Sequence, residues 1–322
     1  MKKCLRRIFI VLVVYNLSLV IITALLSFQA TRDHPMVGQR VASGENQLHV
    51  IESGKAAEGD DPSVVLIHGA STSALDFSTN LQPLLSENWH VLAIDRPGHG
   101  YSDRGDEHMA NQPAHQARMI LDTLHELDIK HPVLVGHSWA GSVVMAALLL
   151  KHEHVDVKAG VLIAGATHPY EGGSAWHVEL TAKPVIGDIF RWQYVAPIGR
   201  LSIESAVQVV FAPETMPENY IEDTGLTLSL RPSAYKSNAL DLTGLSDYLS
   251  VQAPQYPTIT KPLLSIAASD DHVVPAWNHH DRLIKQVKQI TPVMIEGAGH
   301  APHQTRPDVV TELIDTFLGT LQ

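Results

Sequence analysis

Short apolar segments alternate with amphipathic segments along most of this chain. Apolar runs bounded by polar or glycine-containing turns are typical of strands buried on both faces of a parallel sheet. Six such runs occur, at residues 64–68, 90–94, 132–136, 160–164, 262–267 and 292–296. Amphipathic segments between them predict helices at residues 76–86, 113–127, 139–150, 277–287 and 307–318. Together they predict an α/β fold with a mostly parallel, doubly wound sheet and helices on both faces.

The alternation stops between residues 170 and 258. This stretch has scattered glycine and proline and no run typical of a parallel strand. We therefore expect a mainly helical cap at residues 170–258, inserted into one α/β core formed by residues 47–169 and 259–322. Its aromatic residues either form a small core of the cap itself or line a substrate pocket; they are Trp176, Trp192, Tyr194, Phe211, Tyr220 and Tyr235.

The first thirty residues follow a different pattern. Residues 8–28 form an uncharged apolar run that is preceded by four cations within residues 2–7. About 20 helical residues span a hydrocarbon core of about 30 Å, and the cations favour a cytoplasmic N-terminus. We therefore predict that residues 1–30 anchor the chain in a membrane and that the rest lies on the non-cytoplasmic side. The polar residues 31–46 are predicted to be a linker.

A cleaved signal peptide is the alternative for the N-terminal segment, and it would make the protein secreted or periplasmic. The apolar run is longer than the 7–15 residues usual for a signal peptide. Cleavage after Ala30 would also place Phe28 where a small residue is required. These two observations favour an uncleaved anchor.

Composition excludes several classes of function. The chain has 322 residues and a formal net charge of −11, which disfavours nucleic acid as a partner. Its single cysteine, Cys4, precedes the apolar run and excludes both an intrachain disulfide and a cysteine nucleophile in the folded body. The pairs His152/His154 and His279/His280 lie in polar stretches that we expect to be exposed, and no His-Glu-x-x-His pattern occurs. We predict no metal site.

The strongest chemical signal is Gly-His-Ser-Trp-Ala-Gly at residues 136–141, between a predicted strand and a predicted helix. A serine hydroxyl is a poor nucleophile until a base removes its proton. A sharp strand-to-helix turn presents the serine to such a base, and it requires small residues on either side. Gly136 and Ala140 meet this requirement, although glycine is more common at the second position. Ser138 is therefore the predicted nucleophile.

The base and its supporting acid are predicted in loops that follow two later strands. Asp270 and Asp271 follow the strand at 262–267, and the spacing Asp-x-Val-Val-Pro selects Asp271 over its neighbour. His300 follows the last strand in Gly-Ala-Gly-His. Asp271 is the predicted acid and His300 the predicted base, in the chain order Ser–Asp–His. His303 is expected at the surface or in a supporting position.

Negative charge that develops on a reacting carbonyl needs preplaced N–H donors. We expect one donor at the backbone N–H of Trp139, which follows the nucleophile. The second is expected at the N–H of Ala70, in the loop after the strand at 64–68. His68 is expected to hold that loop in place rather than to transfer protons.

Five motifs make the chain resemble the α/β-hydrolase superfamily, and within it the branch of capped esterases, C–C hydrolases and haloperoxidase-like proteins. They are LIHGAS (66–71), DRPGHGYSD (95–103), GHSWAG (136–141), SDDHVVP (269–275) and GAGHAPH (297–303). The resemblance implies that Asp95, Arg96 and His99 are mainly structural. Thr305 stands where the family often has glutamate, a difference that concerns the stability of the loop.

The resemblance implies a serine hydrolase that works through an acyl-enzyme, without a cofactor, on a small-molecule substrate. The expected substrate is a carboxylic ester with an apolar part. Haloalkane dehalogenases and epoxide hydrolases of this fold need an aspartate nucleophile, which Ser138 replaces here. Cleavage of a C–C bond and perhydrolysis remain alternatives on the same three residues. A non-catalytic binding protein has less support, because no member of the triad is missing.

Overall fold

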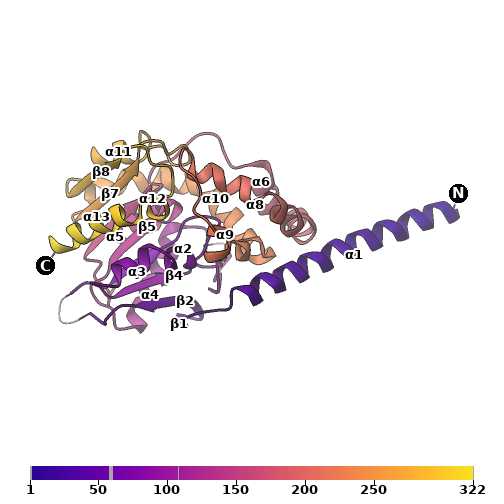
Figure 1. The fold of residues 1–322 in the computed structure, drawn as a ribbon, viewed down its shortest axis with the longest axis horizontal. Coiled ribbons are helices and arrows are strands. Elements are labelled where there is room, and N and C mark those ends of the chain that lie inside the picture. Colours follow the sequence, from indigo (N-terminus) through magenta and orange to yellow (C-terminus); the bar gives the residue numbers. More distant parts are fainter. Residues whose placement is uncertain (1, 58–60, 108, 322) are drawn as a thin grey trace.

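The computed structural model describes residues 2–57, 61–107 and 109–321. Within these residues, eight strands form one sheet in the order β1–β2–β4–β3–β5–β6–β7–β8 (Figure 1). The strands are β1 (Gln39–Ser43), β2 (Asn46–Ser53), β3 (Val64–Ile67), β4 (Val91–Ile94), β5 (Val133–His137), β6 (Ala159–Ile163), β7 (Leu263–Ala268) and β8 (Ile290–Ile295). The β1–β2 and β2–β4 pairs are antiparallel, and the other pairs are parallel. The prediction of a mostly parallel sheet is confirmed.

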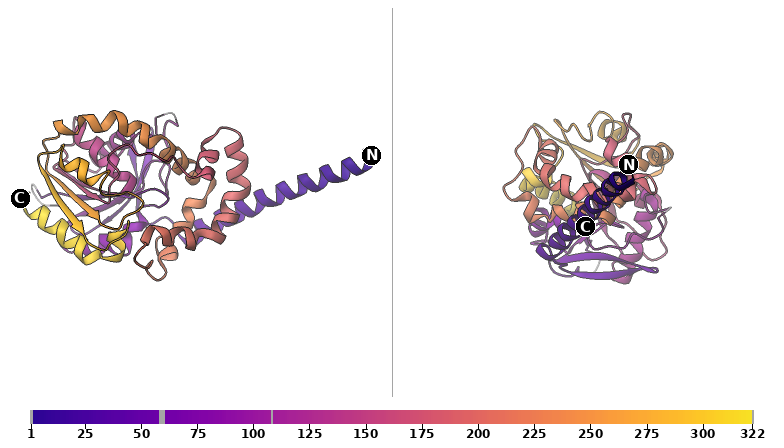
Figure 2. Two further views of the ribbon diagram at one scale, coloured as in Figure 1. Left: turned by 90° about the horizontal axis from the view of Figure 1, so that it is seen from above. Right: turned by 90° about the vertical axis from the view of Figure 1, so that its right-hand side faces the viewer.

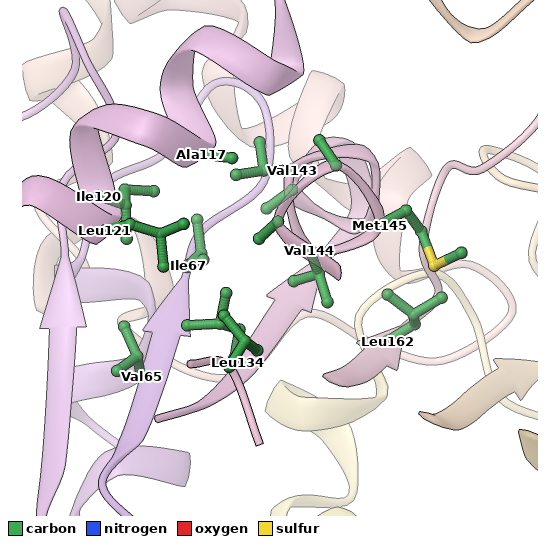
Figure 3. Packing of buried hydrophobic residues seen from close by; sticks show 14 of the residues in the cluster. Val65, Ile67, Ala117, Ile120, Leu121, Leu134, Val143, Val144, Met145 and Leu162 are labelled. Carbon is green, nitrogen blue, oxygen red and sulfur yellow. The ribbon is translucent and has the colours of Figure 1, made fainter. Parts of the chain in front are cut away.

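Alternation along each strand divides the interior into two cores. In β3, Val65 and Ile67 belong to one core, whereas Val64 and Leu66 belong to the other, because successive side chains point to opposite faces. Helices α4 (Pro113–Glu126) and α5 (Gly141–Leu149) cover the first face. Figure 3 shows their apolar side chains packed against those of β3, β5 and β6.

The opposite face is covered by α2 (Leu75–Ser78), α3 (Leu81–Leu85) and α13 (Pro307–Gly319). The single helix expected over residues 76–86 is thus two short helices, because the backbone at Asn80 leaves the helical region with φ −132° and ψ −78°. The helix expected over residues 277–287 is also shorter, since α11 covers only His280–Ile284. The short helix α12 (Pro302–Thr305) precedes α13.

The residues between β6 and β7 are mainly helical, as the interrupted alternation predicts. They form α6 (Trp176–Ala182), α7 (Ile186–Phe190), a π-helical turn (Arg191–Val195), α8 (Ala196–Phe211), α9 (Tyr220–Asp223), α10 (Pro232–Gln252) and two 3₁₀ turns (Leu226–Leu230 and Ala253–Thr258). Figure 2 shows this cap at one end of the sheet, on the side from which the N-terminal helix leaves the body.

The cap is held to the core by a buried ion pair. Arg96 follows β4, and its Nη1 lies 2.6 Å from Oδ2 of Asp241 on α10. Both side chains are fully buried. Oδ1 of Asp241 lies 2.8 Å from Nη1 of Arg104, whose side chain is 13% exposed. One carboxylate of the cap therefore meets two cations of the core.

Helix α1 (Lys2–Asp33) is long and apolar enough to cross a membrane. It packs against the π-helical turn, α8 and the 3₁₀ turn at Leu226–Leu230, and its N-terminal half projects away from the body (Figures 1 and 2). The linker expected over residues 31–46 is wrong in extent, because α1 continues to Asp33 and β1 occupies Gln39–Ser43. The edge strand joins the fold through buried Val41 and through Ser43, which donates to the carbonyl of Met119 at 3.0 Å.

The ion pair of Asp241 predicts a large effect on stability. Asp241→Asn removes the negative charge and leaves Arg96 buried without its partner, so the free energy of unfolding should fall by about 3–5 kcal/mol. Glu107→Gln breaks the exposed pair of Glu107 with Lys236 and should cost less than about 1 kcal/mol. Urea unfolding of both variants measures the difference. Equal losses would contradict the role of the buried pair.

Candidate active site

Ser138 lies at a sharp turn where β5 meets a 3₁₀ turn (Ser138–Ala140) and then α5. Its φ is 53°, in the left-handed region that costs a non-glycine residue about 1–2 kcal/mol. Strain of this kind persists only where the surrounding structure fixes the residue. The turn places the hydroxyl at the carboxyl edge of the sheet.

Two glycines make this turn possible. A Cβ atom at Gly136 would lie 2.6 Å from the carbonyl oxygen of Ala140, and one at Gly141 would lie 2.7 Å from the Cα of Gly165. Both distances are shorter than a van der Waals contact. Ala140 is fully buried and accommodates its methyl group. The strict requirement thus falls on residues 136 and 141 rather than on residue 140.

The structure brings Ser138, Asp271 and His300 together. The Ser138 hydroxyl donates to Nε2 of His300 at 2.8 Å, and Nδ1–H of His300 donates to Oδ2 of Asp271 at 2.7 Å. The three residues follow β5, β7 and β8, and they are 8%, 5% and 4% exposed. All three predicted residues therefore form one hydrogen-bonded series.

Asp271 is suited to remain charged beneath the imidazole. Burial alone would raise the pKa of its carboxyl, but hydrogen bonds from His300 and from the N–H groups of Val273 and Val274 hold the pKa below its usual value. Each of these two N–H groups lies 2.8 Å from Oδ1. Neighbouring Asp270 is partly exposed, and its carboxylate is 3.4 Å from Oγ of Ser269. The geometry therefore selects Asp271, as the spacing does.

The loop that carries His300 is held by the cap. The N–H of His300 donates to the carbonyl of Val210 at 3.1 Å, and the N–H of Gly299 donates to Oε2 of Glu214 at 3.0 Å. The Glu214 carboxylate also accepts hydrogen bonds from Thr305 and Arg306, at 2.9 Å each. A cap glutamate thus supports the loop in which Thr305 replaces the family's common glutamate. No sequence motif marks Glu214.

The loop after β3 passes directly beside the serine. A Cβ atom on Gly69 would lie 3.0 Å from the Cβ of Ser138. Arg96 donates to the carbonyls of His68 and Gly69 at 3.0 Å each, and its own N–H donates to Nε2 of His68 at 2.9 Å. Burial and the nearby Arg96 lower the pKa of His68 to about 3. His68 is therefore a neutral residue that holds the loop, as expected.

The N–H of Ala70 has no hydrogen-bond partner within the part of the chain that the structure describes. It is therefore free to donate a hydrogen bond. The other expected donor, Trp139, is fixed by its side chain, whose Nε1 donates to the carbonyl of Asp241 at 3.0 Å. The guanidinium of Arg96 lies 4.2 Å from the centre of the Trp139 ring.

A second histidine–carboxylate pair lies behind His300. Nε2 of His303 is 3.0 Å from Oδ2 of Asp76, and the rings of His303 and His137 are 4.2 Å apart. His137 in turn donates to the carbonyl of His300 at 3.1 Å. Of the two places expected for His303, the structure shows the buried supporting one. Asp76 has no sequence signal, because only the folded chain brings α2 beside α12.

Asp76, His137 and His303 place ligand-type atoms within 4.8 Å of one another. Burial would raise the pKa of Asp76, but pairing with His303 lowers it to about 2. Asp76 also accepts a hydrogen bond from the hydroxyl of Tyr220 at 2.7 Å. Its two oxygens are therefore occupied by protein donors, and the cluster acts as a support for the His300 loop.

The expectation that His279 and His280 are exposed is wrong. Both are buried. Nδ1 of His279 accepts hydrogen bonds from the N–H groups of Thr167 and His168, at 3.1 and 3.2 Å, and His280 is bonded to Ser265 at 2.8 Å. His279 thus satisfies backbone groups beyond β6, and His280 satisfies a hydroxyl within β7. The sequence did not indicate this, because the backbone partners of His279 lie more than 100 residues away and no motif marks the pairing of His280 with Ser265.

The cap aromatics divide into two groups. Phe211 and Tyr220 are buried and pack edge to face, with ring centres 4.9 Å apart. Trp176 and Trp192 are 70% and 41% exposed, so neither belongs to a cap core. A cavity of about 380 Å³ lies between α6, α10 and the loop of Tyr170. Its lining contains none of Ser138, Asp271 and His300.

Comparison with known proteins identifies the family. Residues 64–313 match the model of the alpha/beta hydrolase family. The chain belongs to this family. The hydrolase is 23% identical over 280 residues to 2-hydroxy-6-oxononadienedioate/2-hydroxy-6-oxononatrienedioate hydrolase of Cupriavidus pinatubonensis, covering 85% of this chain and 91% of the relative. It is 25% identical over 259 residues to esterase YbfF of Escherichia coli, covering 79% and 92% of the two chains.

Solved structures show the same fold. An esterase from Thermogutta terrifontis has a TM-score of 0.69 at 20% identity, with 88% of this hydrolase and 99% of the esterase covered. A membrane phospholipase A, described as a bacterial virulence factor, has a TM-score of 0.67 at 21% identity, with 100% of this hydrolase and 99% of that chain covered. The second similarity thus includes α1.

The strained backbone of Ser138 predicts a difference between two variants that both lack the hydroxyl. Ser138→Gly relieves the left-handed strain and Ser138→Ala retains it, so the glycine variant should be more stable by about 1 kcal/mol. Urea unfolding of the two proteins measures the difference. An alanine variant at least as stable as the glycine variant would contradict the strain at this turn.

Proposed function

We propose that this hydrolase is a serine esterase that forms a covalent acyl-enzyme at Ser138 and is held at a membrane by α1. The observation that carries the proposal is the hydrogen-bonded series from Ser138 through His300 to Asp271. A hydroxyl in contact with a base, and a base oriented by a carboxylate, are the elements that nucleophilic catalysis by serine requires.

The first half of the reaction forms the acyl-enzyme. Nε2 of His300 takes the proton of Ser138 as Oγ attacks the ester carbonyl carbon. The resulting oxyanion accepts hydrogen bonds from the N–H groups of Ala70 and Trp139. When the tetrahedral intermediate collapses, the ester C–O bond breaks and the imidazolium gives its proton to the departing alcohol. The charged Asp271 stabilises this imidazolium.

The second half releases the acid. Water replaces the alcohol beside His300, which removes a proton as the water oxygen attacks the acyl carbon. The same N–H groups bind the second oxyanion. Collapse then returns the proton to Oγ of Ser138 and frees the carboxylic acid. Every proton moves between Ser138, His300, the substrate and water, so the reaction needs no cofactor.

Ester hydrolysis is supported over other reactions of the family by the residue at position 138. Epoxide hydrolases are among the relatives, including one from Mycobacterium tuberculosis that is 26% identical, but such enzymes use an aspartate nucleophile. Esterases are among both the relatives and the structural neighbours. The relative from Cupriavidus keeps C–C bond hydrolysis as the second candidate.

The membrane anchor is supported by the continuity of α1. An unbroken helix runs from Lys2 to Asp33. An 18-residue stretch of it has a mean hydropathy of 2.7, and only 6% of that stretch is buried. Ala30, the last residue that a signal peptidase would remove, is 2% exposed. Cleavage there would remove the part of α1 that packs against the cap. The cations before the apolar run support an orientation with the catalytic domain on the non-cytoplasmic side.

Ser138→Ala should abolish the proposed activity. Loss of the nucleophile should lower kcat for p-nitrophenyl esters by about 10⁴-fold or more, and a fluorophosphonate probe should label the wild type but not the variant. The panel includes short and long acyl chains and phosphatidylcholine in vesicles. Equal hydrolysis by wild type and variant would contradict the nucleophile.

A vinylogous diketone serves as the substrate for the second candidate. Faster cleavage of its C–C bond than of every ester would replace esterase with C–C hydrolase while leaving the triad in place. A protein that reacts neither with substrates nor with the probe would be a binding protein on this fold.

The two neighbouring aspartates provide a matched test of the acid. Asp271→Asn should lower kcat by about 10³–10⁴-fold, because the amide cannot stabilise the imidazolium. Asp270→Asn should change kcat by less than about twofold, because its carboxylate does not contact His300. Steady-state kinetics of both variants at neutral pH measure this contrast. A similar loss in both would contradict the selection of Asp271.

A further inference from the structure

The cap has an exposed apolar face beside α1. This apolar face comes from α7, the π-helical turn and the first turns of α8, and its side chains are 41–90% exposed: Val185, Ile186, Ile189, Trp192, Ile198 and Leu201. Soluble proteins rarely leave a contiguous group of large apolar side chains in water, and such groups mark contact with a protein or a membrane. Leu201, at 90%, is almost entirely uncovered.

Few charges lie within the segment that carries this face. Residues 185–201 contain three charged side chains, Asp188, Arg191 and Arg200. Asp188 and Arg191 form an ion pair within one helical turn, and Arg200 is half-buried and lines the crevice between α8 and α1. The six exposed side chains of the face itself are uncharged. This pattern differs from a polar cap surface that is adapted to water.

The packing of α1 fixes which part of the cap lies at the membrane. Positions 16, 19, 20, 23, 26, 27 and 30 of α1 are buried or half-buried, a spacing that forms one stripe along a helix. This stripe faces the cap, where Leu26 and Ser27 line a small crevice with Ala196 of α8. The C-terminal half of the apolar run at 8–28 therefore lies alongside the cap.

The free half of α1 is too short to span a bilayer alone. Residues 2–15 are exposed on all sides, and fourteen helical residues extend about 21 Å. A hydrocarbon core is about 30 Å thick. The membrane must therefore also enclose part of α1 that packs against the cap, and the adjoining cap surface enters with it.

We propose that the apolar face of the cap is inserted among the lipid acyl chains of the bilayer that α1 spans. The occupant of this face is lipid, because the face adjoins the anchor and its six exposed side chains are apolar and uncharged. The proposal rests on the anchor in the proposed function, but it does not rest on the esterase activity. Figure 2 shows α1 leaving the body along this side of the cap.

Site-directed fluorescence on the full chain tests whether the apolar face of the cap contacts lipid. Cys4→Ser removes the single native thiol, and a cysteine is then introduced by Leu201→Cys or, as a control, by Val251→Cys. Val251 is 69% exposed and lies near the end of α10, outside the apolar face. Each protein carries an environment-sensitive nitrobenzoxadiazole label and is reconstituted in phosphatidylcholine vesicles, with and without doxyl-labelled lipid.

The label at 201 should emit at shorter wavelength than the label at 251, and doxyl lipid should quench its fluorescence about threefold. The reason is that a side chain inserted about 5–10 Å into the interface contacts lipid acyl chains. The label at 251 should remain unquenched. A shift at 201 without lipid quenching would mean that protein, such as a second copy of this chain, covers the face, and would overturn the proposal.

Alkaline carbonate extraction of the same vesicles distinguishes anchoring by α1 from insertion of the apolar face. If the protein stays in the membrane while the label at 201 reports water, insertion of the apolar face is overturned and anchoring by α1 is retained. If the protein is released from the vesicles, both anchoring and insertion are overturned. Esterase assays on the same samples report separately on the triad.

Discussion

The buried guanidinium of Arg96 joins the parts on which the site depends. It donates to two carbonyls of the loop beside Ser138, lies over the ring of Trp139, and pairs with Asp241 of the cap. A buried cation is tolerated only when hydrogen bonds and an opposite charge compensate for lost hydration. Because the compensating carboxylate belongs to α10, the loop after β3 is fixed only when the cap is docked. Core, cap and site therefore form one unit.

A second junction holds the histidine side of the site. The loop of His300 meets Val210 and Glu214 of the cap above it and the pair of Asp76 and His303 behind it. These supports act on backbone groups and buried side chains, so they restrict the position of the imidazole without contacting its nitrogen atoms. The cap thus contacts the site at two places, the loop after β3 and the loop of His300.

The parts of the structure that could be predicted from sequence are those with a local signal. Strands β3–β8 are largely apolar, and the turn at Ser138 has glycines at the positions where a side chain would collide. The structural interpretation of the motif at 95–103 also has a local cause. Asp95 accepts hydrogen bonds from the N–H groups of Ala74 and Tyr101, and a side chain at Gly100 would overlap its carboxylate.

The parts that could not be predicted depend on contacts between distant segments. Asp76 and Glu214 have no surrounding motif, and their roles arise only when they reach the loop of His300. His279 and His280 look like surface residues until their partners are known, which are backbone N–H groups beyond β6 for His279 and the hydroxyl of Ser265 in β7 for His280. The antiparallel strands β1 and β2 lie in a polar stretch in which only a few buried positions alternate. Polar residues are thus harder to place than apolar ones.

The strand order has a consequence for the order in which this protein is made. Helix α1 is synthesised before the sheet, whereas His300 lies in the loop after β8, the last strand of the sheet. Because a chain grows from its N-terminus, α1 exists before the residue that completes the hydrogen-bonded series. Ser138 remains without its hydrogen-bond partner until β8 has paired with β7. In a nascent chain the apolar helix α1 is therefore complete before Ser138, His300 and Asp271 can come together.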